Sequence, residues 1–181
     1  MWFHGKYRGP GKRSRRMRGR DYSAAGYYFI TFNTYRRQHL LGTIEEGVTM
    51  LNECGGILLS EWRRLDRTRS DVITDICAIM PNHFHGLLYL QPLNGIVPAL
   101  GTGDIDAFKC RAGTLGAVVA QLKSRVTKRI REIPGHEHMR VWQENYHDRI
   151  IRDRRDLLRI RRYIMRNPAC FGKKKNRKRG I

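Results

Sequence analysis

The sharpest chemical feature of the sequence is a pair of histidines separated by one residue, His83-Phe84-His85. Residues i and i+2 of a β-strand point to the same face, so a strand here would set both imidazoles side by side and turn Phe84 into the core. Two neighbouring imidazoles can bind one divalent cation, which can neutralise a phosphate oxygen as a Lewis acid. Mg²⁺ or Mn²⁺ suits such a site if oxygen ligands complete the shell. Taken alone, the motif is a weak signal for a metal and favours two ordinary surface histidines.

A second chemical feature lies near the end of the chain, where Tyr163 and Asn167 are four residues apart. In a helix this spacing puts both side chains on one face. A phenolic oxygen can attack phosphorus and leave a covalent phosphotyrosine, and the amide one turn away could be a third metal ligand. The plainer interpretation is a tyrosine packed on a sheet and an asparagine that caps the helix before Pro168.

The elements that must position these residues follow from the hydrophobic pattern. Apolar and β-branched runs predict strands over residues 27–34, 72–80 and 84–90 and a final strand within residues 141–151, and residues 44–51 could add a short strand pairing. Helical spacing of apolar residues predicts helices over 52–65, 114–133 and 154–167, the last with Asp153 as N-cap and ended by Pro168. Residues 91–113, rich in glycine, are predicted to form a long loop.

The order of these elements is strand, helix, strand, strand, helix, strand, helix. It predicts an α+β fold of the ferredoxin-like (RRM-like) type, with an antiparallel sheet, helices on one face, and an additional C-terminal helix that carries Tyr163. We expect one domain over residues 23–170, flanked by a basic N-terminal arm (1–22) and a basic C-terminal tail (171–181).

The charge balance indicates the partner. The chain has 36 Lys and Arg against 16 Asp and Glu, a formal net charge of +20, which favours a polyanion and by default nucleic acid. No apolar run is long enough to span a bilayer, so no membrane partner is expected. The four cysteines form no C-x-x-C pair and are expected to be free thiols of a cytosolic protein. Together these features predict a cytoplasmic, nucleoid-associated bacterial protein.

Basic side chains near the predicted site and on the second helix are expected to contact DNA phosphates. These are Arg125, Lys128, Arg129, Arg149, Arg152, Arg159, Arg162 and Arg166. Trp142 and Gln143 are candidates for reading or stacking on bases, although Trp142 could equally be a core residue.

Ordered sequence blocks resemble a known family. The block Met80-Pro81-Asn82-His83-Phe84-His85-Gly86 is similar to the HUH signature of the tyrosine transposases of single-strand-transposing insertion sequences. Later blocks resemble the branch of REP-associated tyrosine transposases: Val141-Trp142-Gln143-Glu144-Asn145-Tyr146 and Arg161-Arg162-Tyr163-Ile164-Met165-Arg166-Asn167-Pro168. The early blocks Arg18-Gly19-Arg20-Asp21-Tyr22 and Tyr27-Tyr28-Phe29-Ile30-Thr31 match it too.

This resemblance implies a specific activity. In that family the two histidines of the motif hold the metal, here His83 and His85 with Mg²⁺ or Mn²⁺, and a helix-borne tyrosine, here Tyr163, attacks single-stranded DNA. A polar residue one turn on, here Asn167, completes the metal site. The products are a 5′-phosphotyrosine and a free 3′-hydroxyl, and the substrates lie beside small hairpins such as REP palindromes. The family includes both monomers and homodimers.

The sequence also departs from the family pattern, and alternatives stay open. His147-Asp148-Arg149 stands where Glu-His is expected after an aromatic residue. Tyr146 is a second possible nucleophile, ranked lower because it falls in a strand pattern and lacks a polar partner at i+4.

Two other functions fit parts of the pattern. A non-catalytic RRM-like module would expose aromatic residues such as Tyr28, Phe29 and Phe32 on its sheet, but no RNP motif is present. A replication initiator or relaxase would normally be a longer chain.

Overall fold

The computed structural model describes residues 24–91 and 113–171. The expected basic arm (1–22), nearly all of the expected loop (91–113) and nearly all of the basic tail (171–181) lie outside the described residues, as does Cys110.

Four strands form one antiparallel sheet: β1 (Gly26–Asn33), β4 (Val72–Met80), β5 (His83–Leu90) and β6 (His147–Ile150). Their order across the sheet is β4-β5-β1-β6, so the first and third of the four strands along the chain lie in the centre. This is the ferredoxin-like order, and it confirms the predicted α+β fold.

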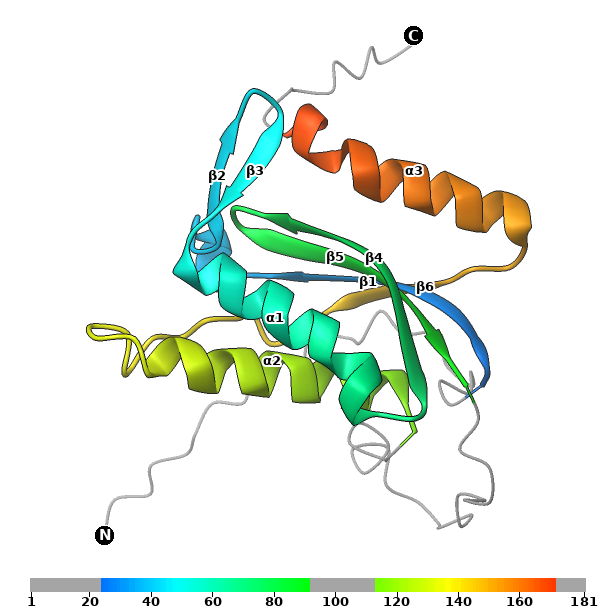
Figure 1. The fold of residues 1–181 in the computed structure, drawn as a ribbon, viewed down its shortest axis with the longest axis horizontal. Helices are drawn as coiled ribbons and strands as arrows, with labels where there is room; N and C mark the ends of the chain where they lie inside the picture. Colours follow the sequence, from blue (N-terminus) through cyan, green and yellow to red (C-terminus); the bar gives the residue numbers. More distant parts are fainter. Residues whose placement is uncertain (1–23, 92–112, 172–181) are drawn as a thin grey trace, which may run out of the picture.

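The helices divide between the two faces of the sheet (Figure 1). α1 (Glu53–Thr68) and α2 (Leu115–Arg131) cover one face, and α3 (Arg154–Cys170) covers the other. Each helix begins at a side-chain cap, because Asn52, Thr114 and Asp153 each accept a hydrogen bond from the backbone N–H three residues on. The sheet therefore has two buried faces, with a large core under α1 and α2 and a smaller one under α3.

A short hairpin extends from the sheet after β1. A 3₁₀ turn (Tyr35–Arg37) leads into β2 (Gly42–Glu45) and β3 (Val48–Leu51), which pair with each other in a separate two-stranded sheet. This is the short strand pairing predicted over residues 44–51. In Figure 1 the hairpin stands beside the C-terminal end of α3.

One predicted boundary is wrong, and one predicted strand occupies only part of its segment. Pro168 does not end α3, which continues to Cys170; proline lacks an N–H, but its carbonyl accepts a hydrogen bond from the N–H of Phe171, so the last turn still closes. The final strand, β6, lies within residues 141–151 as predicted and takes up only the end of that segment. Trp142 makes only an isolated bridge to Thr34, because Val141 and Trp142 are buried by packing into the core rather than by sheet pairing.

Alternation along β5 sorts its side chains between the two cores. Phe84 is fully buried under α1, where its ring lies 4.8 Å from the Phe32 ring and 5.1 Å from the Trp62 ring. His83 and His85 point to the α3 face, as does Leu87. The prediction that Phe84 packs in the core between two histidines on the other face is confirmed.

None of the described helices is long and apolar enough to cross a membrane.

A substitution at Gly86 tests how closely β5 packs against the aromatic rings under α1. A Cβ at this position would lie 2.7 Å from the Phe84 ring and 2.8 Å from the Trp62 ring, and neither buried ring has room to retreat. We expect Gly86→Ala to lower the free energy of unfolding by about 1–3 kcal/mol in urea denaturation.

Gly56→Ala is the matched control. Gly56 lies in α1 with open space around its Cβ position, so alanine should raise helix stability by up to about 1 kcal/mol. Equal effects of the two substitutions would contradict the packing described for β5.

Candidate active site

The turn between β4 and β5 presents the two histidines. Ala78 pairs with His85 and Met80 with His83, and Pro81-Asn82 makes the turn between them. The turn is fixed to the end of β1, since the backbone N–H and the hydroxyl of buried Thr34 both donate to the carbonyl of Asn82. The backbone that carries the histidines is therefore held from both sides.

The two imidazoles converge through their Nε2 atoms, which lie 3.1 Å apart. Each Nδ1 has an oxygen partner at 2.7 Å: Asn82 Oδ1 for His83 and Thr31 Oγ1 for His85. When Nδ1 donates to that oxygen, the Nε2 lone pair is free, and two such lone pairs then face one point. This donor set fits a divalent cation held by both Nε2 atoms.

The remaining ligands of such a cation would be oxygens. No third His, Cys, Asp or Glu joins the pair within the ranges that the structure describes. Amide, water and substrate oxygens would complete the shell, which suits Mg²⁺ or Mn²⁺.

Both histidines are neutral at neutral pH. Burial lowers the pKa of His83 to about 4, with a further contribution from the positive charge of Arg37. Burial also lowers the pKa of His85 to about 3, and His83 adds to this shift. The neutral forms retain the lone pairs that metal binding needs.

Tyr163 reaches the histidine pair from α3 of the same chain. Its ring centroid lies 5.5 Å from that of His85 and 5.9 Å from that of Phe29, with which it makes an edge-on contact. The side chain is still 46% exposed, so a substrate can approach it. Asn167 follows one turn later, half-buried, on the same stripe of the helix.

α3 is held over the sheet by a small apolar core and ion pairs at its edges. Ile160 and Ile164 pack against the α3 face of the sheet, together with Leu87. Arg161 donates two hydrogen bonds to Asp75 of β4, at 2.9 and 2.6 Å. These contacts set the position of Tyr163 over the histidines.

The alternative nucleophile and one of the two predicted base readers lie in the core, whereas the other base reader lies near the histidine pair. Tyr146 packs against the α1–α2 core and its hydroxyl is buried. Trp142 is only 7% exposed, and its indole N–H donates to the carbonyl of Lys123, so it is a core residue with no free ring face for a base. Gln143 is more accessible and bonds to Asn33, the strand partner of His83.

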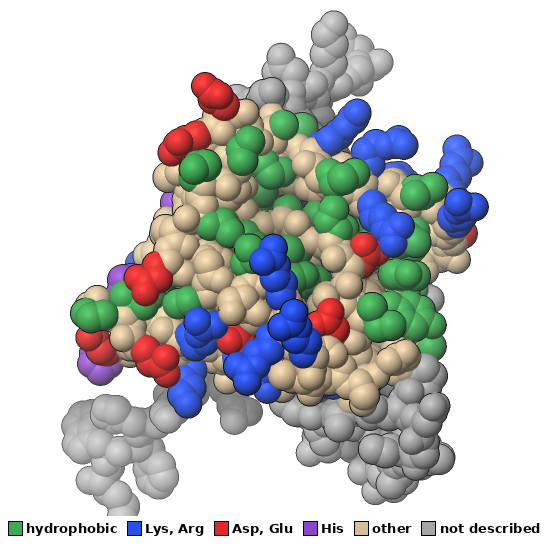
Figure 2. Space-filling view, in the orientation of Figure 1, with side chains coloured by type: hydrophobic (Ala, Val, Ile, Leu, Met, Phe, Trp, Pro, Cys, Tyr) green, Lys and Arg blue, Asp and Glu red, His purple; other side chains and the backbone are tan. Residues whose placement is uncertain are grey.

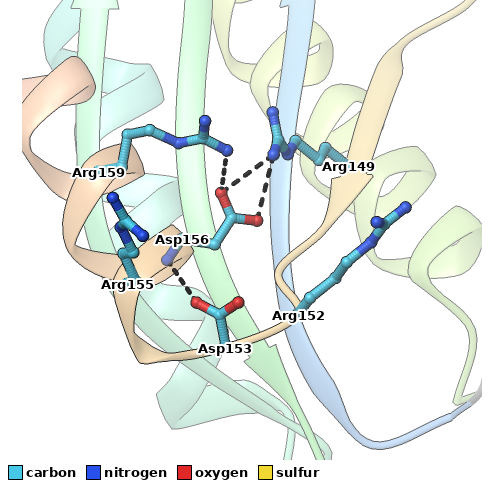
Figure 3. Close-up of a pocket in the computed structure, with 6 residues that line it drawn as sticks. All are labelled: Arg149, Arg152, Asp153, Arg155, Asp156 and Arg159. Carbon is cyan, nitrogen blue, oxygen red and sulfur yellow. Dashed lines mark hydrogen bonds and ion pairs between the residues drawn. The ribbon is translucent and has the colours of Figure 1, made fainter.

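The predicted DNA-contacting arginines fall into two groups. Arg149, Arg152 and Arg159 line a cavity at the start of α3 (Figure 3), and Arg162 and Arg166 are exposed farther along this helix. In the space-filling view, basic side chains gather over α3 and, separately, over α1 (Figure 2).

The second group, on α2, lies on the other side of the sheet. Arg129 pairs with buried Glu61 at 3.0 Å, and Arg125 donates to Thr68 at 3.2 Å, so both hold α2 against α1. Lys128 is exposed beside them. The structure therefore does not bring Arg125, Lys128 and Arg129 together with the histidine pair.

Sequence reasoning missed two contributors to this site. Thr31 was placed in a predicted strand and in an early block that resembles the family, but it was given no role at the site, where its hydroxyl contacts the His85 ring. His147, in the segment that departs from the family pattern, lies directly opposite Thr31 in the β1–β6 pairing and therefore faces the same side of the sheet as the histidine pair. Only the pairing of strands distant in sequence could have revealed either position.

Comparisons with known proteins bear on the family and on the fold of the chain. No protein-family model matches the sequence. A protein of uncharacterised function from Haemophilus influenzae (strain Rd) is 32% identical over 163 residues, which cover 88% of this chain and 89% of that relative. The chain belongs to the same family as this Haemophilus protein.

A solved structure shows that the fold is also found in a transposase. The REP-associated tyrosine transposase bound to a REP hairpin aligns with a TM-score of 0.56 and 20% identity, over 84% of this chain and 72% of the other. At this identity the likeness establishes the fold. A structure from Deinococcus radiodurans R1, described as a candidate transposase, aligns more distantly, with a TM-score of 0.47 and 18% identity over 83% and 96% of the two chains.

The lowered pKa values predict that acid destabilises the metal-free protein. Because the folded state holds both histidines neutral, their contribution to stability is complete above about pH 6.5 and is lost as the pH falls toward 4. In chelator, the free energy of unfolding should fall between pH 7 and pH 5, and His83→Asn should reduce that slope. His138→Asn, which removes an exposed histidine, should leave it unchanged; equal slopes in all three proteins would contradict this explanation.

Thr31 is predicted to support metal binding indirectly. Thr31→Val keeps the shape and removes the oxygen that orients the His85 ring, so Mn²⁺ affinity measured by calorimetry should fall by about 10–100-fold. Thr43→Val, on the exposed β2–β3 hairpin, is the control and should bind Mn²⁺ like the native protein. Unchanged affinity in Thr31→Val would mean that His85 needs no such support.

Proposed function

We propose that the protein is a metal-dependent, site-specific DNA strand transferase that nicks and rejoins single-stranded DNA beside hairpins. The observation that carries this proposal is the position of the Tyr163 ring, 5.5 Å from His85 within one chain, over two imidazoles whose Nε2 atoms converge. The net charge of +20 and the fold shared with a hairpin-bound transposase support the same substrate class.

In the proposed reaction the phenolic oxygen of Tyr163 attacks the scissile phosphorus. A bond forms between that oxygen and phosphorus, and the bond from phosphorus to the 3′-oxygen breaks. The phenolic proton is lost and the departing 3′-oxygen takes up a proton, which leaves a 5′-phosphotyrosine and a free 3′-hydroxyl. Attack by a 3′-hydroxyl on the phosphotyrosine reverses the bond changes and rejoins DNA, so no nucleotide cofactor is required.

His83, His85 and the amide of Asn167 would hold the cation. Bound there, Mg²⁺ or Mn²⁺ would supply positive charge to the scissile phosphate. The arginines of α3 would hold the strand on either side, since guanidinium groups form several hydrogen bonds with phosphate.

One chain contains all the proposed groups, so the protein would act as a monomer, although a homodimer that exchanges α3 would preserve the same contacts. Its DNA substrate places the expected activity in the bacterial cytoplasm at the nucleoid. REP-like palindromes are the proposed hairpins.

The alternative of a non-catalytic RRM-like module receives less support. Its bases would stack on central aromatic residues, but Tyr28 and Phe32 are buried under α1 and α2. Phe29 faces the other side, where the Tyr163 ring packs on it. The sheet thus offers no open aromatic platform among these residues.

A cleavage assay tests the proposal. Labelled single-stranded hairpin DNA from the flanks of the gene, incubated with Mg²⁺ or Mn²⁺, should yield a protein–DNA adduct that survives denaturation. Tyr163→Phe should reduce the adduct by at least about a thousandfold, because no other group supplies the nucleophile. His83→Ala and added chelator should also abolish it.

Tyr146→Phe is the matched control, since it removes a phenol that lies away from the histidines, and it should retain the adduct. An adduct that survives Tyr163→Phe but not Tyr146→Phe would move the nucleophile to Tyr146. Tight binding without any adduct on REP-like hairpins would overturn the transferase in favour of a binding module.

A further inference from the structure

An arginine-lined cavity of about 400 Å³ lies between the end of β6 and the first two turns of α3. Figure 3 shows its lining residues, which are Arg149, Arg152, Asp153, Arg155, Asp156 and Arg159. Four guanidinium groups meet two carboxylates there, so positive charge is in excess. Within residues 24–91 and 113–171, no aromatic side chain lines the cavity.

Asp156 organises this cavity. Its buried carboxylate accepts two hydrogen bonds from Arg149 of β6, at 3.0 and 3.2 Å, and one from Arg159 of α3, at 2.5 Å. These hydrogen bonds lower the pKa of Asp156, the bond from Arg159 most strongly, so the carboxylate stays ionised. Two guanidinium groups from different elements are thereby held in fixed orientations (Figure 3).

Much of the donor capacity of these arginines is uncommitted. A guanidinium carries five N–H donors, and Arg149 and Arg159 each direct a single nitrogen at Asp156. Arg152 and Arg155 form no ion pair with any residue in the described ranges, and in Figure 3 they stand on either side of Asp153. Asp153 itself is occupied as the N-cap of α3. The cavity is therefore built to accept an anion with several acceptor oxygens.

The cavity lies beside the candidate active site, because residues that line it neighbour residues of the site on α3 and in the β1–β6 pairing. Arg159 lies one turn before Tyr163 on α3, about 6 Å along the helix axis. Arg149 lies opposite Phe29 in the β1–β6 pairing, and the Phe29 ring contacts the Tyr163 ring. This rise of about 6 Å between positions 159 and 163 is similar to the spacing of neighbouring phosphates in an extended single strand.

We infer that this cavity is a subsite for one phosphodiester of single-stranded DNA, adjacent to the phosphate that Tyr163 attacks, and that Asp156 is its positioning residue. The adjacency rests on the proposed transferase function, whereas the phosphate site itself does not. Because no aromatic side chain lines it, the subsite would fix the register of the strand without reading bases.

Two possible roles of Asp156 predict opposite effects of Asp156→Asn on DNA affinity. If Asp156 only contributed charge, Asp156→Asn would remove a negative group from a basic surface and tighten DNA binding. If Asp156 holds Arg149 and Arg159 in place, the same substitution releases both guanidinium groups and weakens binding despite the gain in net positive charge.

The salt dependence of DNA binding tests the site without cleavage. The native protein in chelator is titrated with a labelled thymidine oligonucleotide over a series of salt concentrations. Arg152→Gln combined with Arg155→Gln should reduce the slope of log K against log salt by about 0.7, the value for one phosphate of a single strand. Asp156→Asn should weaken binding at every salt concentration.

Arg64→Gln combined with Arg67→Gln is the matched control. It removes the same charge from exposed positions on α1, on the opposite side of the sheet, and should leave the slope unchanged. The subsite would be overturned if both double variants reduced the salt dependence equally, or if the double variant of the cavity did not reduce it. Tighter binding by Asp156→Asn would overturn its positioning role.

The adduct assay can also test whether the cavity binds a phosphate next to the scissile one. The DNA then carries a neutral methylphosphonate in place of one of the two phosphates that flank the cleavage position. Neutralising one of the two should reduce adduct formation in the native protein and cause no further reduction in the Arg152→Gln, Arg155→Gln protein. If each methylphosphonate reduced adduct formation as strongly in that variant as in the native protein, the cavity would not bind a phosphate next to the scissile one. Absence of any adduct would instead overturn the transferase, and the salt slopes would still decide the phosphate site.

Discussion

The hydrogen bond between Thr31 Oγ1 and His85 Nδ1, 2.7 Å long, is the contact on which the geometry of the site depends. It exists because β1 and β5 pair in the one register that sets Thr31 opposite His85. A shift of one residue would turn every side chain of β5 to the opposite face, so Phe84 would leave the core and the imidazoles would enter it. The fully buried rings of Phe32 and Phe84 make that shift costly, and so the core of the domain also specifies the site.

The two faces of the sheet have different roles. The face under α1 and α2 holds most of the large apolar side chains and supplies stability. The face under α3 holds the histidines, Thr31 and the tyrosine helix. An antiparallel sheet with helices on both faces thus provides a rigid support for one set of side chains while presenting another set to substrate.

Much of the fold could be predicted from the sequence, because hydrophobic period and turn residues are local signals. The strand at 72–80 was predicted at both ends, and the cap at Asp153 was recognised from its residue type. The face that α3 covers was not predicted, since a helical pattern does not say which side of a sheet it will meet. The burial of Trp142 was left open because it depends on packing between segments distant in sequence.

The candidate site, too, could be predicted only where local sequence spacing determines it. The spacing of His83 and His85 predicted that they share a face, and the structure confirms it. Thr31 and Asn82 lie in blocks that resemble the family, but the sequence does not show that they are the partners of the Nδ1 atoms. The ion pair of Asp75 with Arg161 joins residues far apart in the chain. Such contacts depend on tertiary packing and are visible only once the strands are paired.

The modest attachment of α3 has an energetic consequence. It buries three residues, Asp156, Ile160 and Ile164, whereas α1 and α2 bury seven each. Of the described helices, α3 therefore buries the fewest of its own side chains, and we expect its backbone amides to exchange with solvent through an opening that leaves the rest of the domain folded. Such an opening would move Tyr163 away from the histidine pair without unfolding the core under α1 and α2.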